Sequence, residues 1–270
     1  KAEGEAMDLS HGLPYTASMR IYAGDYDDVA DCAMVIVTAG ANQKPGETRL
    51  DLIGKNVAIL KSIIPQLTSR NFKGILMIVS NPVDVLTYAA WRLSGLPAHR
   101  VIGSGTVLDT ARLKYLLSQE LGGRQPQCPR RHHRRARGQR AGRVEQRQHS
   151  SVDLAQFCTL RGIQDQAALR DKIYHEVRDS AYEIIQRKGA TYYGIAMAVA
   201  RIAECIVRDE RAMLPVSVLL QGQYGLDGLC LSIPAIVGRN GVEDTLEIPP
   251  LPGRAGGPAG LRRHPAGHGG

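Results

Sequence analysis

The sequence has few aromatic residues, no long hydrophobic run and no cysteines at a metal-binding spacing. Aromatics make up 5% of the 270 residues, with one Trp and two Phe. No apolar stretch approaches the roughly 20 residues of a membrane-spanning helix, and the N-terminal residues lack a signal-peptide pattern. The cysteines lie scattered along the chain, as is usual for reduced cysteines; they are Cys32, Cys128, Cys158, Cys205 and Cys230. These absences predict a soluble, cytoplasmic protein without a metal site.

The net charge of +8 is concentrated in one block. Residues 124–150 contain nine Arg and one Glu, with no Lys or Asp, so the remainder of the chain is neutral. Neither this block nor the Arg-containing tail from residue 251 has the periodicity that would bury one face of a helix or strand. The basic balance is therefore a property of two short segments and not of the folded body.

Elsewhere, short buried strands alternate with amphipathic helices. In the first part we expect strands at residues 19–22, 33–37, 74–79 and 101–104, and helices at 6–11, 50–67, 85–91 and 109–121. After the Arg-rich block we expect helices at 171–188 and 193–208 and antiparallel strands at 216–220 and 228–233, continued by 234–238. The alternation in the first part predicts an α/β fold with a parallel sheet. The helices and hairpin-like strands of the second part predict an α+β arrangement.

The loop after residues 33–37 is the most informative stretch. This apolar run ends in small residues and opens into a Pro-Gly loop, which is typical of the ligand-facing edge of a doubly wound sheet. The loop supplies Gln43 and Arg49, and a guanidinium at the mouth of a crevice can bind a carboxylate or a polarised carbonyl. The alternative is a solvated surface loop.

Three further clusters follow in the places where such a fold presents ligands. Asn81 comes at the end of a buried strand and would direct its amide into the crevice, or it forms an ordinary Asn-Pro turn. Asp109 and Arg112 lie one helical turn apart. They either orient a catalytic base and bind a substrate carboxylate, or form a helix cap and a surface pair. Thr191 places a hydroxyl at a break between two helices. Together, and in this order, these clusters indicate a ligand site.

In these motifs, and over residues 1–123 and 152–249, the chain closely resembles the L-lactate dehydrogenases of the lactate/malate dehydrogenase family, particularly bacterial ones. The resemblance implies an oxidoreductase of glycolysis that ferments pyruvate to lactate, with hydride transfer between L-lactate or pyruvate and NAD. It implies an NAD-binding domain at residues 1–103, built on a partial Rossmann-type parallel sheet. An α+β substrate and catalytic domain would follow at residues 104–270.

The resemblance also implies roles for individual residues. Arg49 would polarise the substrate carbonyl from a closing loop, Arg112 would bind the substrate carboxylate, and Asp109 would be the partner of a catalytic His. Asn81 and Thr191 would contact the substrate. The positions implied to line the NAD site are Lys1, Tyr26, Gly40, Ala41, Ser62, Val79, Ser80, Asn81 and Ser104.

Gln43 separates the two branches of the family. The resemblance implies that this residue reads the group beyond the keto acid, where malate dehydrogenases carry an Arg that pairs with the second carboxylate of oxaloacetate. A neutral Gln leaves that carboxylate unpaired and favours pyruvate. A malate or other 2-hydroxy-acid dehydrogenase is the alternative enzyme.

The chain departs from the family in two places. The family's opening strand and Gly-x-Gly-x-x-Gly turn would precede Lys1, so we expect weak NAD binding by the chain as printed. The family places its catalytic His in an Ile-Ile-Gly-Glu-His-Gly-Asp motif, where this chain has the Arg-rich block, and neither His132 nor His133 matches that position. Read one nucleotide later, the codons of this block permit the family motif. We therefore expect residues 124–151 and 250–270 to be out of frame, and the chain as written to be inactive.

A role in binding is the remaining alternative. A catalytically dead relative would bind polyanions non-specifically through the Arg-rich block, with strong salt dependence. The block lacks interleaved aromatics and a recognition helix, so we expect no specific nucleic acid partner. The resemblance implies a homotetramer. It also leaves open activation by fructose 1,6-bisphosphate, which some bacterial members bind through a basic residue near Lys114.

Overall fold

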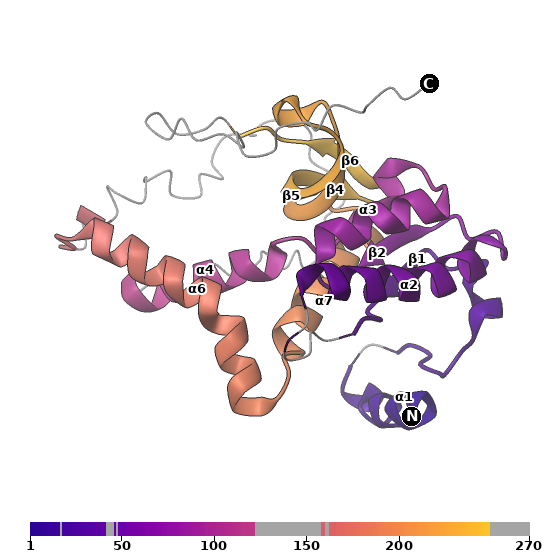
Figure 1. Cartoon of the computed structure of the whole chain (residues 1–270). Coiled ribbons are helices and arrows are strands. Elements are labelled where there is room, and N and C mark those ends of the chain that lie inside the picture. Colours follow the sequence, from indigo (N-terminus) through magenta and orange to yellow (C-terminus); the bar gives the residue numbers. More distant parts are fainter. Residues whose placement is uncertain (17, 42–45, 47, 122–157, 160–161, 249–270) are drawn as a thin grey trace, which may run out of the picture.

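The structure is a computed structural model that describes residues 1–16, 18–41, 46, 48–121, 158–159 and 162–248. Within these residues the strands form one mixed sheet in the order β1-β2-β3-β4-β5-β6 (Figure 1). The strands β1 (Met34–Val37), β2 (Ile75–Ile78) and β3 (Val101–Gly103) run parallel to one another. The strands β4 (Ala212–Gln221), β5 (Asp227–Gly238) and β6 (Gly241–Thr245) continue the sheet in antiparallel pairing.

The first core lies between the parallel strands and the helices α2 (Arg49–Thr68) and α3 (Val83–Ser94). All four residues of β2 are buried, as expected for a parallel strand that is covered on both faces. Leu60 and Ile64 of α2 and Leu86 of α3 are fully buried and pack with Leu76 and Ile78 of β2. This core fixes α2 against the sheet, with its first turn near the strand ends.

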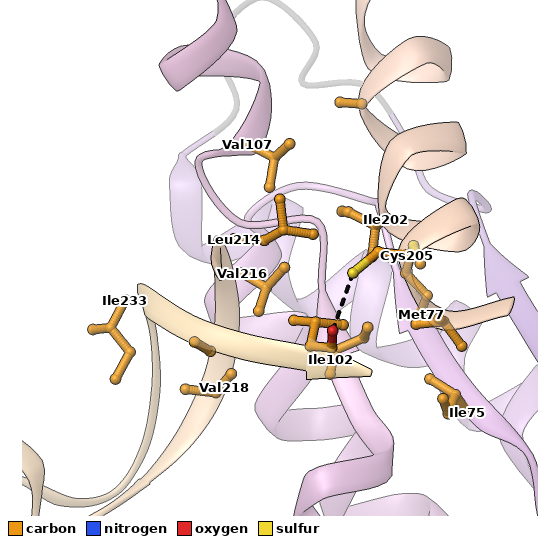
Figure 2. Packing of buried hydrophobic residues seen from close by; sticks show 14 of the residues in the cluster. Ile75, Met77, Ile102, Val107, Ile202, Cys205, Leu214, Val216, Val218 and Ile233 are labelled. Atoms are coloured by element: carbon orange, nitrogen blue, oxygen red, sulfur yellow. Dashed lines mark hydrogen bonds between the residues drawn. The ribbon is translucent and has the colours of Figure 1, made fainter. Parts of the chain in front are cut away.

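The second core lies on the opposite face of β2, because side chains alternate along a strand. It packs Met77 and Ile102 of the parallel strands against Ile202 of α7 (Tyr193–Val207) and Val216 of β4 (Figure 2). The Cys205 thiol in this core donates a hydrogen bond to the Val237 carbonyl at 3.0 Å. The two parts of the chain therefore share one sheet, and both contribute residues to this second core.

The remaining helices lie largely outside these two cores. They are α1 (Ala2–His11), α4 (Val107–Leu121) and α6 (Gln166–Lys188), and the short 3-10 helices η1 (Leu13–Tyr15), η2 (Tyr26–Val29), η3 (Ala98–Arg100) and η4 (Gln223–Gly225). In Figure 1, α1 stands apart from the sheet, and none of its residues is buried. No helix in the described part of the chain is both long enough and apolar enough to cross a membrane.

The predicted fold class is confirmed, with an α/β first part and an α+β second part. The strand predicted at residues 19–22 is wrong, because this segment has no strand conformation. Met19 and Tyr22 are more than half exposed there, and no neighbouring strand among the described residues pairs with them. The segments 228–233 and 234–238 form the single strand β5, and β6 was not predicted.

Candidate active site

The carboxyl ends of β1, β2 and β3 meet at one edge of the sheet, which we call the strand-end edge. The Val79 N–H donates to the Val37 carbonyl at 3.0 Å, and the Ser104 N–H donates to the Ile78 carbonyl at 2.8 Å. In parallel α/β sheets ligands bind at this edge, because the connecting loops diverge there. Most of the residues predicted to line the NAD site lie here; they are Gly40, Ala41, Val79, Ser80, Asn81 and Ser104.

Ser80 joins the ends of β1 and β2. Its hydroxyl donates to the Ala39 carbonyl at 2.5 Å, and the residue is 8% exposed. Gly40 packs directly on it, since a Cβ at Gly40 would lie 3.1 Å from the Ser80 Cβ. The Ser80 proton is therefore used within the fold, and a side chain at position 40 would require Ser80 to shift by a few tenths of an ångström.

Asn56 of α2 forms a second connection between the same strand ends, and the sequence analysis missed it. Its side-chain oxygen accepts from the Ala41 N–H at 2.7 Å, and its amide nitrogen donates to the Asn81 carbonyl at 2.8 Å. A signal was present in the sequence: Asn56 lies on the helix stripe that carries Leu60 and Ile64, both fully buried. A polar residue on a buried stripe normally has hydrogen-bond partners.

The first turn of α2 is fixed by a reciprocal capping box. The Thr48 hydroxyl accepts from the Asp51 N–H at 3.2 Å, and the Asp51 carboxylate accepts from the Thr48 N–H at 3.0 Å. The Thr48 hydroxyl also donates to the Asp51 carboxylate at 2.6 Å, and this hydrogen bond, together with that from the Thr48 N–H, holds the pKa of the Asp51 carboxyl below its usual value. The capping box makes Thr48 the N-cap, so the helix begins at Arg49. The Arg49 side chain and all of Gln43 lie outside the described part of the structure.

Asp109 and Arg112 form an ion pair in the first turns of α4. The Arg112 Nη1 donates to the Asp109 Oδ1 at 2.9 Å; the Arg112 side chain is 17% exposed and that of Asp109 is 49% exposed. The helix starts at Val107, shortly after Ser104 at the end of β3, and the Val107 N–H donates to the Ser104 carbonyl at 3.5 Å. The ion pair therefore lies beside the strand-end edge.

Thr191 lies in the link between α6 and α7. Gly189 ends α6 in a left-handed conformation (φ 84°), and α7 begins at Tyr193. The start of α7 packs on α4, because a Cβ at Gly194 would lie 3.1 Å from a methyl carbon of Leu108. The fold thus brings the segment of Thr191 to the helix that carries Asp109.

The other predicted NAD-site residues are more dispersed. Tyr26 of η2 lines an open hollow of about 380 Å³ beside β1, whose wall ends at Thr38 and Ala39 of the strand-end edge. Ser62 lies exposed on α2, where its hydroxyl bonds the Ile59 carbonyl at 2.7 Å. Lys1 precedes α1, the helix that stands apart from the sheet (Figure 1). The structure therefore does not bring Lys1 to the strand-end edge.

The strand-end edge suits a dinucleotide. The hollow beside β1 has apolar walls from Val29, Val35 and Val37 and ends at the exposed residues Thr38 and Ala39, which suits planar rings joined to polar ribose and phosphate groups. No group of His, Cys, Asp and Glu side chains among the described residues has the arrangement of a metal site. The residues fit NAD as the cofactor of this edge.

Comparison with known protein families gives matches over both parts of the chain. Residues 1–103 match the family described as lactate/malate dehydrogenase, NAD binding domain, and residues 106–254 match the lactate/malate dehydrogenase, alpha/beta C-terminal domain. Since the first match is an NAD-binding domain, NAD is the cofactor of the family to which this part is similar.

Individual relatives give the same result. The L-lactate dehydrogenase of Acetivibrio thermocellus is 48% identical over 254 residues, which cover 92% of this chain and 78% of that protein. That of Thermoanaerobacterium saccharolyticum is 49% identical, covering 92% and 80%. The crystal structure of a minor L-lactate dehydrogenase from Enterococcus mundtii superimposes with a TM-score of 0.79 at 36% identity, covering 93% of this chain and 80% of that one.

These matches extend over both halves of the fold. The chain belongs to the lactate/malate dehydrogenase family of NAD-dependent enzymes, and within that family it is an L-lactate dehydrogenase by relationship.

Proposed function

We propose that the strand-end edge and the start of α4 form the site of hydride transfer between L-lactate and pyruvate. The observation that carries this proposal is the position of Asn81 and of the Asp109–Arg112 pair at the same edge of the parallel sheet. Residues 1–103 would form the cofactor domain and residues 104–270 the substrate and catalytic domain. The 48% identity to a lactate dehydrogenase over most of the chain supports this assignment.

Different residues would bind the carboxylate, the carbonyl oxygen and the remaining group of the substrate. Arg112 would bind the substrate carboxylate; within the described residues it uses one of its five N–H donors on Asp109 and keeps donors for a bidentate contact. Arg49 would stabilise the charge that develops on the carbonyl oxygen. Asn81 and Thr191 would hydrogen-bond the substrate, and Gln43 would favour pyruvate over oxaloacetate because it leaves a second carboxylate unpaired.

The cofactor would lie along the strand ends. When bound, NAD supplies the acceptor or donor of the hydride. Gly40, Ala41, Val79 and Ser104 would hold it through backbone contacts, because the small residues at this edge allow close approach. Tyr26 would line the far end of its site across the hollow beside β1, and Lys1 and Ser62 are the remaining residues assigned to it.

The catalytic base is the missing part of this site. The family uses an imidazole that Asp109 would orient, and the segment that would contain it, residues 124–151, lies outside the described residues. We propose that this segment and residues 250–270 are written out of frame and that the chain as written does not turn over. General acid–base catalysis alone contributes roughly 10²–10⁴-fold, so its loss would leave little activity.

Enzyme assay of the purified chain tests this proposal. We expect no pyruvate-dependent oxidation of NADH by the chain as written. The matched protein is the chain whose coding DNA is read one nucleotide later across residues 124–151, and it should gain at least about 100-fold in rate. Turnover by the chain as written would contradict its proposed inactivity. A frame-restored protein that prefers oxaloacetate to pyruvate would contradict the lactate assignment.

Assembly, regulation and location complete the proposal. Exposed apolar side chains on α6 and α7, among them Tyr182, Tyr193 and Met197 at 69–73% exposure, support self-association into the proposed cytoplasmic homotetramer, which analytical ultracentrifugation would detect.

Lys114 of α4 is the residue that would contribute to binding of fructose 1,6-bisphosphate. No specific nucleic acid and no membrane partner is proposed, and the malate alternative is decided by the comparison of the two keto acids.

A further inference from the structure

Asn56 is a buried residue of α2 whose side-chain amide hydrogen-bonds two loops outside its own helix. It is 1% exposed, and its side-chain hydrogen bonds within the described residues all go to the backbone of residues 15 or 25 positions away. The Oδ1 accepts from the Ala41 N–H at 2.7 Å, while the Nδ2 donates to the Asn81 carbonyl at 2.8 Å and contacts the Ala41 carbonyl at 3.5 Å. One side chain thus joins the loop after β1 to the loop after β2.

Asn56 occupies a buried position on α2 at which an amide is less favourable than an apolar side chain. Leu60 and Ile64, one and two turns further along α2, are fully buried, so an apolar residue at position 56 would suit the stripe. Burying an amide costs free energy that hydrogen bonds must offset. Ala41 and Asn81 are exposed residues, so we infer that water can reach their backbone groups when Asn56 is replaced. We therefore expect this amide to contribute little to global stability.

The contacts of Asn56 connect two residues of the proposed NAD site. Ser80 already joins the same strands at the Ala39 carbonyl, one residue before Gly40, so the strand ends themselves are held without Asn56. Asn56 acts further out, at Ala41 and Asn81. Its rigid, planar amide fixes the separation of the two loop backbones beyond the ends of the strands.

We propose that Asn56 is a positioning residue: through Ala41 and Asn81 it sets the spacing of the two loops that receive the cofactor and the substrate. This inference rests on the proposed function for the identity of the ligand. Because Asn56 is 1% exposed and its amide is bonded to the Ala41 and Asn81 backbones, it would act on the ligands through these loops. Its role is to keep the Ala41 backbone and the Asn81 side chain in register, so that both reach a bound ligand without reorganisation.

The test is an apolar substitution that preserves packing and removes the connection. Asn56→Leu places a side chain of similar size on an apolar stripe, and Asn56→Asp keeps the acceptor for the Ala41 N–H but removes the donor to the Asn81 carbonyl. Gln66→Leu is the matched control, because Gln66 lies exposed on the same helix. Three readouts are made on the full chain: the unfolding midpoint, amide exchange by residue, and NADH affinity from fluorescence titration.

We expect Asn56→Leu to keep or raise the unfolding midpoint and yet to speed amide exchange at Ala41 by about tenfold, as expected for the loss of one hydrogen bond. Exchange in β2 and β3 should not change. NADH affinity should fall by about tenfold in both Asn56 variants and stay unchanged in Gln66→Leu. A purely structural role would instead move the midpoint and the exchange of the core strands.

Each contrary outcome overturns the inference. Unchanged exchange at Ala41 in Asn56→Leu, which removes the acceptor for its N–H, would mean that Asn56 does not hold the loops. Faster exchange throughout the sheet would make Asn56 an ordinary core residue. Faster exchange at Ala41 with unchanged NADH affinity would place the loops outside the site. If the unsubstituted chain binds NADH too weakly to measure, exchange at Ala41 alone decides whether Asn56 holds the two loops, and unchanged exchange there overturns the inference.

Discussion

Thr48 and Asp51 fix the start of α2 through paired hydrogen bonds between each side chain and the other residue's backbone N–H. Thr48→Ala should destabilise the protein by about 1 kcal/mol, the usual effect of losing an N-cap. It should also raise the pKa of Asp51 toward its ordinary value, since the hydrogen bond from the Thr48 hydroxyl is the largest cause of the lowered pKa. Denaturant unfolding and a carboxyl titration by NMR measure the two effects.

The pH dependence of this cap has a definite sign. Because the pKa of Asp51 is lowered in the folded state, its contribution to stability is complete above the unfolded pKa of about 4 and is lost as the pH falls below it. The difference between the original chain and Thr48→Ala should therefore shrink in acid. Ser62→Ala, in the middle of the same helix, is the control and should show no such pH dependence. An equal difference at all pH values would contradict the assignment.

The cysteines should differ in reactivity according to burial. Burial raises the pKa of the Cys205 thiol, and it raises that of Cys230 to about 12, with the charge of Asp84 adding to the effect. Cys32 is partly exposed. Because the thiolate is the reactive form, iodoacetamide should label Cys32 well before Cys205 and Cys230, as read by peptide mass spectrometry. Labelling of the three at one rate in the native protein would show that the core opens freely; after denaturation the rates should converge.

At the scale of secondary-structure elements, Gly103 allows a close approach of β3 to β4. Gly103 pairs with Ser217 of β4, and a Cβ at Gly103 would lie 2.7 Å from the Ser217 Cβ and 2.9 Å from a methyl carbon of Val83. Gly103→Ala should therefore cost about 1–3 kcal/mol of stability through overpacking. Thermal or denaturant unfolding measures the loss.

Gly54 provides the matched control for this substitution. It lies within α2, where a Cβ would meet no atom within 4 Å. Gly54→Ala should therefore stabilise the protein by about 0.5–1 kcal/mol, because glycine is unfavourable inside a helix. Similar effects of the two substitutions would show that the β3–β4 contact is not as close as described.

Hydrophobic periodicity was sufficient to predict most of these elements, because helices and buried strands are largely encoded by nearby residues. α2 and α7 begin within one residue of their predicted starts. The failure at residues 19–22 has a specific cause: a strand is defined by a hydrogen-bonded neighbour, and local pattern does not reveal whether one is present. The same reason explains β6, whose polar sequence forms a strand by pairing with β5.

On the scale of the whole molecule, the shared core predicts one cooperative unit. Met77 and Ile102 from the first part of the chain pack with Ile202 and Val216 from the second. Unfolding followed by fluorescence of the single Trp, at position 91 in α3, should therefore coincide with unfolding followed by far-UV circular dichroism. Two separate midpoints would show that the parts fold independently.

Substitution within the shared core extends this prediction. Ile102→Ala should destabilise the protein by about 2–5 kcal/mol and shift both unfolding curves together, because Ile102 is fully buried between the two parts. Ile248→Ala is the control, since Ile248 is 61% exposed, and its effect should be small. A shift of only one curve in Ile102→Ala would contradict a common core.

The sequence by itself determined the fold class, the family resemblance and the residue types of the candidate site, since each depends on local pattern or on motifs read in order. Only the tertiary structure decided which of those residues meet. It brought Ala41 and Asn81 together through Asn56, paired Arg112 with Asp109, and left Lys1 away from the strand ends. The physical reason is that these contacts join residues from separate elements or depend on side-chain rotamers, and packing of the helices on the sheet determines both.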